Sequence, residues 1–223
     1  MPTLYLIRHG ENPANITKEF SYRKVDYSLT PRGVQQAQQT AIALKNRGIE
    51  AVYSSPLKRA IETANIIAAE LALPVTIIEE FREVNVGSLE DMPPTNENWQ
   101  LHNDVIRGWF KGDLERRFPD GEDWHDLTNR MVSGLAHVLA ATPHSNSVIV
   151  GHGGIFTASL PRLIPNFELS MIVRQPNHNC SITELHLDAD EVYSLVDWAN
   201  YAHLSDDAAN VVLPMPHARG QSA

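Results

Sequence analysis

Two histidines and two arginines carry the chemistry that this sequence offers. Arg8 and His9 follow a short apolar run near the start of the chain, His152 follows a second apolar run, and Arg59 lies on the first turn of an expected helix. Two guanidinium groups and two imidazoles that converge require an anion, and the forked donors of arginine match the oxygens of a phosphate group. If these four residues lie close together, they predict a site for a phosphate group.

The four residues converge only if the elements that carry them belong to one sheet. Apolar runs typical of buried strands alternate with segments in which apolar residues recur at helical spacing. The expected strands are residues 3–8, 49–55, 74–81, 146–154, 180–187 and 191–199, and the expected helices are 30–48, 55–73, 122–141 and 154–163. This alternation predicts an α/β fold, a three-layer α/β/α sandwich around a mostly parallel central sheet. In such folds ligands bind at the carboxyl ends of the strands, where Arg8, His9 and His152 stand.

Two helix starts can be read from the sequence. Thr30 is expected to cap the first long helix, with Pro31 at its first position. Ser55 is expected to cap the helix that carries Arg59, with Pro56 at its first position. A helix start at Ser55 would also bring unpaired backbone N–H groups near the expected anion.

Residues 88–125 differ in character from the rest of the chain. They are acidic and contain Trp99, Trp109 and Trp124, and we interpret them as a helical insertion, a cap-like segment over the active site. The candidates for a substrate wall are Trp99, His102, Trp109 and Phe110. Packing of these four side chains against the core is an equally open alternative. We expect residues 16–25 and 175–181 to complete the rim.

The order of six short segments resembles a known family. The segments are LIRHGENPAN, LTPRGVQQA, SSPLKRAIETA, REVNVGSLED, FPDGED and VGHGG. They resemble the histidine phosphatase superfamily, branch 1, which includes the phosphoglycerate-mutase-like phosphatases, and the similarity extends to about residue 198. The resemblance implies a metal-independent phosphomonoesterase that needs no cofactor and acts on a small phosphorylated substrate. It also implies that His9 is the nucleophile, which becomes a phosphohistidine.

The resemblance assigns roles to further residues. It implies that one set of residues holds the phosphoryl group: Arg8, Asn15, Arg59, His152 and Gly153. It implies that Glu83 is the general acid and base. Catalysis then needs Glu83 protonated while His9 is neutral, which predicts a bell-shaped or acid-shifted pH profile. The sequence departs from the family at Asn12, where threonine is common, and the exchange is expected to alter contacts near the phosphate.

Several other functions stay open at this point. A cofactor-dependent phosphoglycerate mutase and a phosphoprotein phosphatase of the same family are the main alternatives. Arg116 and Arg117 could form the second anion clamp of a mutase, although a solvated helix face is the favoured interpretation. A metal site on His9 and His152 is disfavoured because neighbouring arginines would repel a cation. An inactive binding protein is disfavoured because the whole catalytic set is present.

Composition bounds the class of protein. The chain has 223 residues, 43% of them hydrophobic, and a net charge of −9 without a basic run, which disfavours nucleic acid as a partner. No stretch is long and apolar enough to enter a membrane, and the single cysteine, Cys180, excludes an intrachain disulfide and is expected to be a buried, inert thiol. We therefore expect a cytoplasmic monomer or homodimer. One catalytic domain is expected over residues 1–202, followed by a flexible tail over 203–223.

Overall fold

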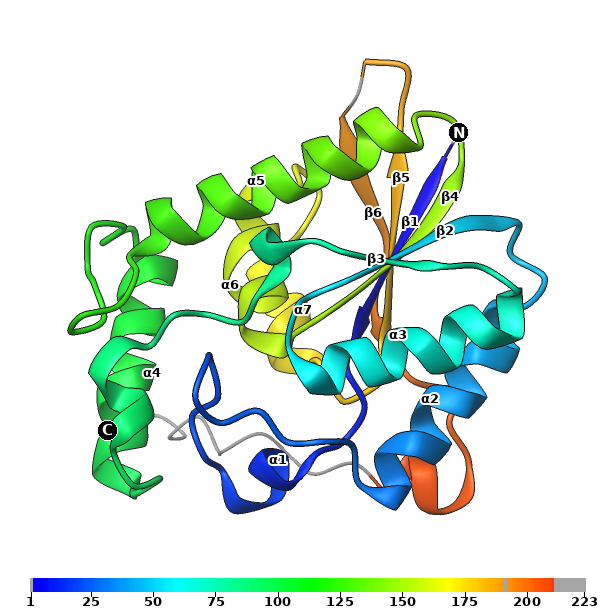
Figure 1. Ribbon diagram of the computed structural model, residues 1–223. Helices are drawn as coiled ribbons and strands as arrows, with labels where there is room; N and C mark the ends of the chain where they lie inside the picture. The colour runs from blue at the N-terminus through cyan, green and yellow to red at the C-terminus, as the bar shows by residue number, and fades with distance from the viewer. Residues whose placement is uncertain (1, 191, 211–223) are drawn as a thin grey trace.

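A six-stranded sheet forms the centre of the protein (Figure 1). The computed structural model describes residues 2–190 and 192–210. The strands are β1 (Thr3–Arg8), β2 (Ile49–Ser54), β3 (Val75–Ile77), β4 (Asn146–Gly151), β5 (Ile182–Leu187) and β6 (Tyr193–Asn200). Their order across the sheet is β3-β2-β4-β1-β5-β6. Adjacent strands run parallel from β3 to β1, whereas β5 is antiparallel to both of its neighbours, so the sheet is mostly parallel as expected.

Helices cover both faces of this sheet. They are α1 (Pro13–Thr17), α2 (Pro31–Leu44), α3 (Lys58–Leu71), α4 (Asn96–Lys111), α5 (Trp124–Ala141), α6 (Gly153–Leu163) and α7 (Leu169–Arg174). Figure 1 shows α2 and α3 on one side of the strands, with α5 and α6 on the other. The predicted three-layer α/β/α sandwich is confirmed.

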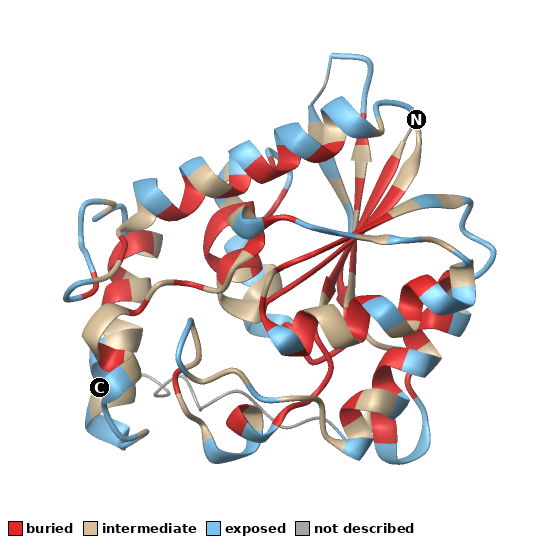
Figure 2. Cartoon of the chain, viewed as in Figure 1, coloured by how far each residue is buried: buried red, intermediate tan, exposed pale blue. Residues whose placement is uncertain are grey.

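Side-chain alternation along β1 explains the two hydrophobic cores. Leu4 and Leu6 join the cluster that contains the buried face of α5 and α6. Tyr5 and Ile7 point the other way, into the cluster formed with α2 and α3. Successive residues of a strand face opposite sides, so a strand that is apolar throughout requires cover on both faces. The central strands β1 and β4 are accordingly buried along most of their length, whereas the edge strands β3 and β6 are more exposed (Figure 2).

The two expected helix starts have different outcomes. The prediction for Thr30 is confirmed, because its side chain accepts a hydrogen bond from the backbone N–H of Gly33 at 3.0 Å. The prediction for Ser55 is wrong: α3 begins at Lys58, and Leu57 occupies the cap position without a side-chain bond. Ser55 is held back because its own N–H donates to the carbonyl of Val150 at 2.9 Å, which keeps it in register with the sheet.

Two expected strands are shorter than their apolar runs. The strand predicted over 74–81 ends at Ile77, and a short 3₁₀ helix, η1 (Glu79–Phe81), follows it. This turn buries the ring of Phe81 completely in the core. The strand predicted from Cys180 begins at Ile182, because Cys180 has a left-handed backbone with a φ of 57°. The thiol is buried as expected, and burial raises the pKa of Cys180 to about 12.

The insertion consists of a 3₁₀ helix, η2 (Gly87–Asp91), the helix α4 and a loop that leads to α5. Trp109 on α4 is completely buried, and its indole N–H donates to the carbonyl of Arg116 at 2.6 Å. Arg116 and Arg117 lie in that loop, so the expected helix face does not exist. The guanidinium of Arg117 instead binds the carboxylates of Asp123 and Asp126.

The C-terminal segment is ordered where the structure describes it. Leu204 and Ala208 are buried, and a 3₁₀ helix, η3 (Asp206–Ala209), contacts α2. The Gln36 side chain donates to the carbonyl of Ala208 at 3.2 Å. Residues 203–210 of the expected flexible tail therefore pack against the domain, and residues 211–223 lie outside the described part. Among the described helices, none combines the length and the apolar character needed to cross a lipid bilayer.

Candidate active site

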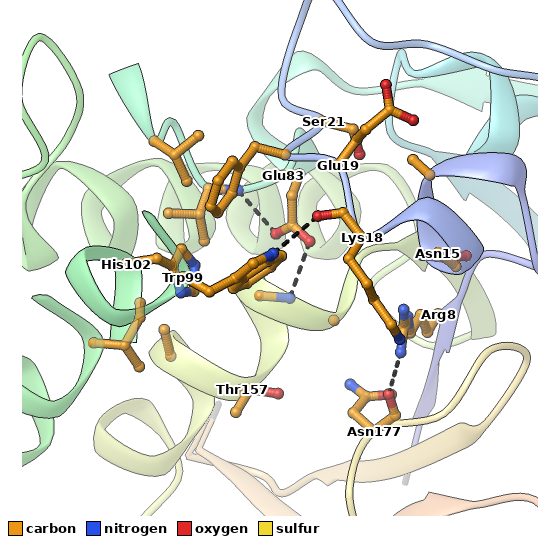
Figure 3. Close-up of a pocket in the computed structure, with 18 of the residues that line it drawn as sticks. Arg8, Asn15, Lys18, Glu19, Ser21, Glu83, Trp99, His102, Thr157 and Asn177 are labelled. Atoms are coloured by element: carbon orange, nitrogen blue, oxygen red, sulfur yellow. Dashed lines mark hydrogen bonds between the residues drawn. The ribbon is translucent and has the colours of Figure 1, made fainter. Parts of the chain in front are cut away.

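A cavity of about 260 Å³ opens at the carboxyl end of β1, beside the start of α6. Its walls come from α1 and the loop after it, from α3, α4 and α6, and from the loop before β5 (Figure 3). Six of the seven expected site residues line it, namely Arg8, His9, Asn15, Arg59, Glu83 and Gly153. The seventh, His152, is completely buried behind His9, and the two ring centroids lie 5.1 Å apart. The predicted convergence of these distant segments is confirmed.

The hydrogen bonds of His9 define its tautomer. Its Nδ1 lies 2.7 Å from the carbonyl oxygen of Gly10, which can only accept, so Nδ1 carries the proton. Its Nε2 accepts a hydrogen bond from Nε of Arg59 at 3.1 Å, which requires a lone pair on Nε2. Burial, together with the charges of Arg59 and Arg8, holds the pKa of His9 well below its ordinary value. The ring is therefore neutral, with Nε2 as its nucleophilic atom.

Backbone carbonyls hold the two arginines in place. Nη1 of Arg8 donates to the carbonyl of Asn177 at 2.6 Å, and Nη2 of Arg59 donates to the carbonyl of Ser21 at 2.8 Å. Burial lowers the pKa of both guanidinium groups, that of Arg59 to about 10, which leaves Arg59 charged at neutral pH. Buried charges are costly unless they are paired. This arrangement is suited to an anion.

Several buried side-chain nitrogens of the site have no hydrogen-bond partner among the described residues. They include Nε of Arg8, Nη1 of Arg59, Nδ1 of His152 and Nδ2 of Asn177, although Nη1 of Arg59 lies 3.8 Å from the carboxylate of Asp26. The other ring nitrogen of His152 lies 2.6 Å from the hydroxyl of Ser55, and this contact explains the position of that serine better than a helix cap does. Burial, with Arg59 as the next cause, keeps the pKa of His152 well below its ordinary value. Buried donors without partners in a native fold mark a place where a ligand binds.

The Glu83 carboxylate sits at the start of α6, on the cavity wall (Figure 3). It accepts hydrogen bonds from the backbone N–H groups of Gly154 at 3.0 Å and of Ile155 at 2.8 Å. It also accepts one from its neighbour Val84 at 2.8 Å. Close approach depends on Gly154, since a Cβ atom there would lie 2.6 Å from the carboxylate. Glu83 thus lines the cavity, and three backbone N–H groups fix the position of its carboxylate.

Asparagines organise the loop after His9. Asn12 caps α1 and is completely buried, and Asn12 and Asn15 each accept a hydrogen bond from the other's backbone N–H. Asn179 donates to the carbonyl of His9 at 2.9 Å and to the side chain of Asn15 at 3.0 Å. Asn12 does not line the cavity, so its effect on the site is exerted through α1. The sequence analysis did not single out Asn179, because an asparagine in a loop carries no positional signal of its own.

The expected rim is confirmed in part. Trp99 and His102 line the cavity, whereas Trp109 lies in the core and Phe110 is not on the wall. The indole N–H of Trp99 donates to the carbonyl of Lys18 at 2.9 Å. Figure 3 shows the Lys18 side chain running along the cavity toward Arg8. The loops over 16–25 and 175–181 both contribute to the wall, as expected.

The described residues contain no group of three or more His, Cys, Asp or Glu side chains that could hold a metal ion.

A model of the histidine phosphatase superfamily, branch 1, matches residues 4–200. The chain belongs to this superfamily. In this member of the superfamily, four residues meet at the carboxyl ends of the strands, namely Arg8, His9, Arg59 and His152.

Relatives of this histidine phosphatase include enzymes named as phosphatases and as mutases. The uncharacterized phosphatase PhoE of Bacillus subtilis (strain 168) is 30% identical over 92% of this chain and 98% of its own length. The probable phosphoglycerate mutase GpmB of Proteus mirabilis (strain HI4320) is 34% identical over 83% of this chain and 85% of its own. These names support an activity of the histidine phosphatase family.

A solved structure shows the same fold. The phosphoserine phosphatase of Entamoeba histolytica, in complex with 3-phosphoglyceric acid, aligns with a TM-score of 0.75 at 28% identity. The alignment covers 92% of this chain and 100% of that one. The mixed sheet and its two helical layers are thus those of a histidine phosphatase.

Proposed function

We propose that the protein is a metal-independent phosphomonoesterase that acts through a phosphohistidine at Nε2 of His9. The observation that carries this proposal is the neutral His9 ring, with its Nε2 lone pair beside Arg59 and its Nδ1 proton bound to the Gly10 carbonyl. A nucleophile of this kind, next to guanidinium donors, supports transfer of a phosphoryl group.

The proposed reaction has two steps. In the first, Nε2 of His9 attacks phosphorus, the P–O bond to the alcohol breaks, and the Glu83 carboxylic acid gives its proton to the departing oxygen. In the second, water attacks the phosphohistidine, Glu83 takes a proton from that water, and the P–N bond breaks to release inorganic phosphate. Arg8 and Arg59 balance the charge on the phosphoryl oxygens in both transition states.

The far wall of the cavity favours hydrolysis of a small ester over mutase chemistry. This wall carries the apolar side chains of Val84, Val86, Trp99, Ile106, Ala158 and Ile172, with three polar side chains on the same helices, those of His102, Asn103 and Thr157. The basic pair that could have served as a second anion clamp is elsewhere: neither Arg116 nor Arg117 lines the cavity, and Arg117 is paired with two carboxylates. We propose a small phosphorylated metabolite as the substrate, with Lys18 as an additional contact for its body.

The test combines a substrate panel with trapping of the intermediate. Release of inorganic phosphate from phosphomonoesters, phosphoserine and 3-phosphoglycerate among them, is measured with and without EDTA for the wild type and for His9→Ala. We expect EDTA to have no effect and the variant to lose on the order of 10⁴-fold in kcat. Rapid quenching with ³²P-labelled substrate should give an acid-labile, base-stable phosphoprotein only in the wild type. Turnover that survives in His9→Ala would exclude the covalent step, and transfer of phosphate between positions of phosphoglycerate faster than its release would favour the mutase.

A further inference from the structure

The general acid assigned to Glu83 lies on a loop that has no regular secondary structure between η1 and η2. We name residues 80–85, which comprise the end of η1 and most of this loop, the acid loop. We propose that Arg130 and Glu122 are positioning residues that hold the acid loop, and through it the Glu83 carboxylate, in place for proton transfer. This inference rests on the proposed function, since it assumes that Glu83 delivers the proton.

One guanidinium group gathers the backbone of the acid loop. Nη1 of Arg130, on α5, donates to the carbonyls of Glu80 at 2.8 Å and of Arg82 at 2.6 Å. Nη2 of the same side chain donates to the carbonyl of Glu83 itself at 3.0 Å. Three carbonyls of an irregular segment thus depend on a single side chain for their hydrogen bonds, and buried carbonyls without donors are costly.

A second contact fixes the arginine and the far end of the loop. The carboxylate of Glu122 accepts from Nε of Arg130 at 3.0 Å and from Nη2 at 2.8 Å, which is a bidentate pair. The same carboxylate accepts from the N–H of Asn85 at 2.8 Å, and the N–H of Glu122 donates to the carbonyl of Asn85 at 3.0 Å. Only 8% of the Glu122 side chain and 20% of the Arg130 side chain are exposed. The pair is therefore shielded from solvent and specific in geometry.

The acid is held at both ends by different elements. The start of α6 binds the Glu83 carboxylate, while α5 binds the Glu83 backbone through Arg130. Neither Arg130 nor Glu122 lines the cavity, so neither can touch a substrate. Their hydrogen bonds act on catalysis through the position of Glu83, and a displacement of about 1 Å at a reacting group can cost about 100-fold in rate. Beyond the effect of burial, the charge of Arg130 also helps to lower the pKa of His152, an effect that does not depend on the leaving group.

The leaving group separates this role from a purely structural one. An alkyl phosphate expels a strongly basic alkoxide and needs a proton from Glu83, whereas p-nitrophenyl phosphate expels a stable phenolate and does not. The value of kcat/KM depends only on the steps up to and including cleavage of the P–O bond to the alcohol. Slow hydrolysis of the phosphohistidine therefore does not affect kcat/KM. For Arg130→Met we expect kcat/KM to fall on the order of tenfold more with an alkyl phosphate than with p-nitrophenyl phosphate.

Three further variants complete the experiment. Arg117→Met is the matched control, because Arg117 pairs with Asp123 and Asp126 near the start of the same helix and makes no contact with the acid loop. We expect it to change both substrates by less than about twofold. Glu122→Gln keeps the size of the side chain and should show the same selective loss in weaker form, which also carries the test if Arg130→Met does not fold.

Glu83→Gln distinguishes failure of this inference from failure of the proposed function. If Glu83→Gln discriminates between the two leaving groups while Arg130→Met and Glu122→Gln lower both substrates equally, the positioning role is wrong and the acid role of Glu83 stands. If Glu83→Gln does not discriminate, the proposed general acid is itself wrong. Thermal melting of each variant identifies losses that follow from unfolding.

Discussion

At the scale of single residues, the proposed reaction depends on which nitrogen of His9 carries the proton. The acceptor that fixes this tautomer is the carbonyl of the next residue, Gly10. The sequence could identify His9, Arg8 and Arg59 as a reactive set because their types are informative and their segments are distinctive. It could not identify this acceptor, since every residue has a carbonyl and only the local backbone path brings one to Nδ1.

The electrostatic environment of His9 leads to a prediction for its titration. Burial and two neighbouring cations lower the pKa of His9, and burial with Arg59 lowers the pKa of His152. An unfolded histidine binds its proton at about pH 6.5, so between that pH and the lower folded-state pKa the unfolded chain binds more protons than the folded one. We expect NMR titration of the free enzyme to show both rings neutral at pH 6.5 and below, and the free energy of unfolding to fall as the pH decreases through this window.

The control for this titration is Arg59→Met, which removes one of the two neighbouring cations. The His9 transition should then move to higher pH, toward the ordinary histidine value. A wild-type His9 transition centred above pH 6.5 would contradict the neutral nucleophile derived from the hydrogen bonds. A transition that Arg59→Met leaves in place would contradict the contribution of Arg59 to the low pKa of His9.

At the scale of elements, the site is made by the junctions of strands with helices, and these junctions explain where sequence reasoning succeeds. Thr30 was predicted correctly as a cap because a cap is a local feature, decided by bonds between residues three positions apart. Ser55 was predicted wrongly because long-range contacts hold it at the end of β2: its N–H donates to the carbonyl of Val150, and its hydroxyl lies 2.6 Å from Nε2 of His152. The run over 74–81 was too long as a strand because burial of Phe81 turns the chain.

The start of α6 gives a prediction about Gly154. Alanine there would place Cβ 2.6 Å from the Glu83 carboxylate, so the carboxylate must move away from the backbone N–H groups that hold it. We expect Gly154→Ala to lower kcat/KM for alkyl phosphates at least about tenfold. The loss of folding stability should be small, because alanine is favoured over glycine inside a helix by about 1 kcal/mol, which offsets part of the crowding.

The measurements are steady-state kinetics and denaturant unfolding of the same sample. The control variant is Ser133→Ala, because Ser133 lies on α5 and is exposed. A second glycine such as Gly112 is unsuitable, since its φ of 100° makes any substitution strained. The Ser133→Ala variant should leave both quantities unchanged. A Gly154→Ala protein with unaltered turnover of alkyl phosphates would show that the close packing of Glu83 against α6 has no part in proton transfer.

At the scale of the whole molecule, a chain of contacts connects the C-terminal segment with the loop that carries His9. Asp207 binds Arg32, and Arg32 binds the buried carboxylate of Glu11, two residues after His9. The sequence predicted a tail that frays here, because the segment after Ala202 is rich in Ala, Pro, Asp and His. The sequence could not reveal that Leu204 packs with Ala37 and Cys180 in a separate hydrophobic cluster.

This connection gives a prediction for Leu204, which is only 7% exposed. Leu204→Ala removes buried apolar atoms and leaves a cavity, so we expect the free energy of unfolding to fall by about 2–3 kcal/mol in denaturant titrations. The matched control is Ile42→Ala on α2, because Ile42 is 66% exposed and its truncation should cost about 0.5 kcal/mol or less. Helix α2 also holds the loop after His9, because the Gln36 side chain accepts a hydrogen bond from the N–H of Glu11 at 2.9 Å. We therefore expect Leu204→Ala, which loosens the packing against α2, to lower the temperature at which activity is lost in parallel with Tm. Equal stability of the two variants would mean that residues 203–210 pack on the domain without contributing to its free energy of unfolding. The contacts from Asp207 through Arg32 to Glu11 would then not stabilise the loop that carries His9.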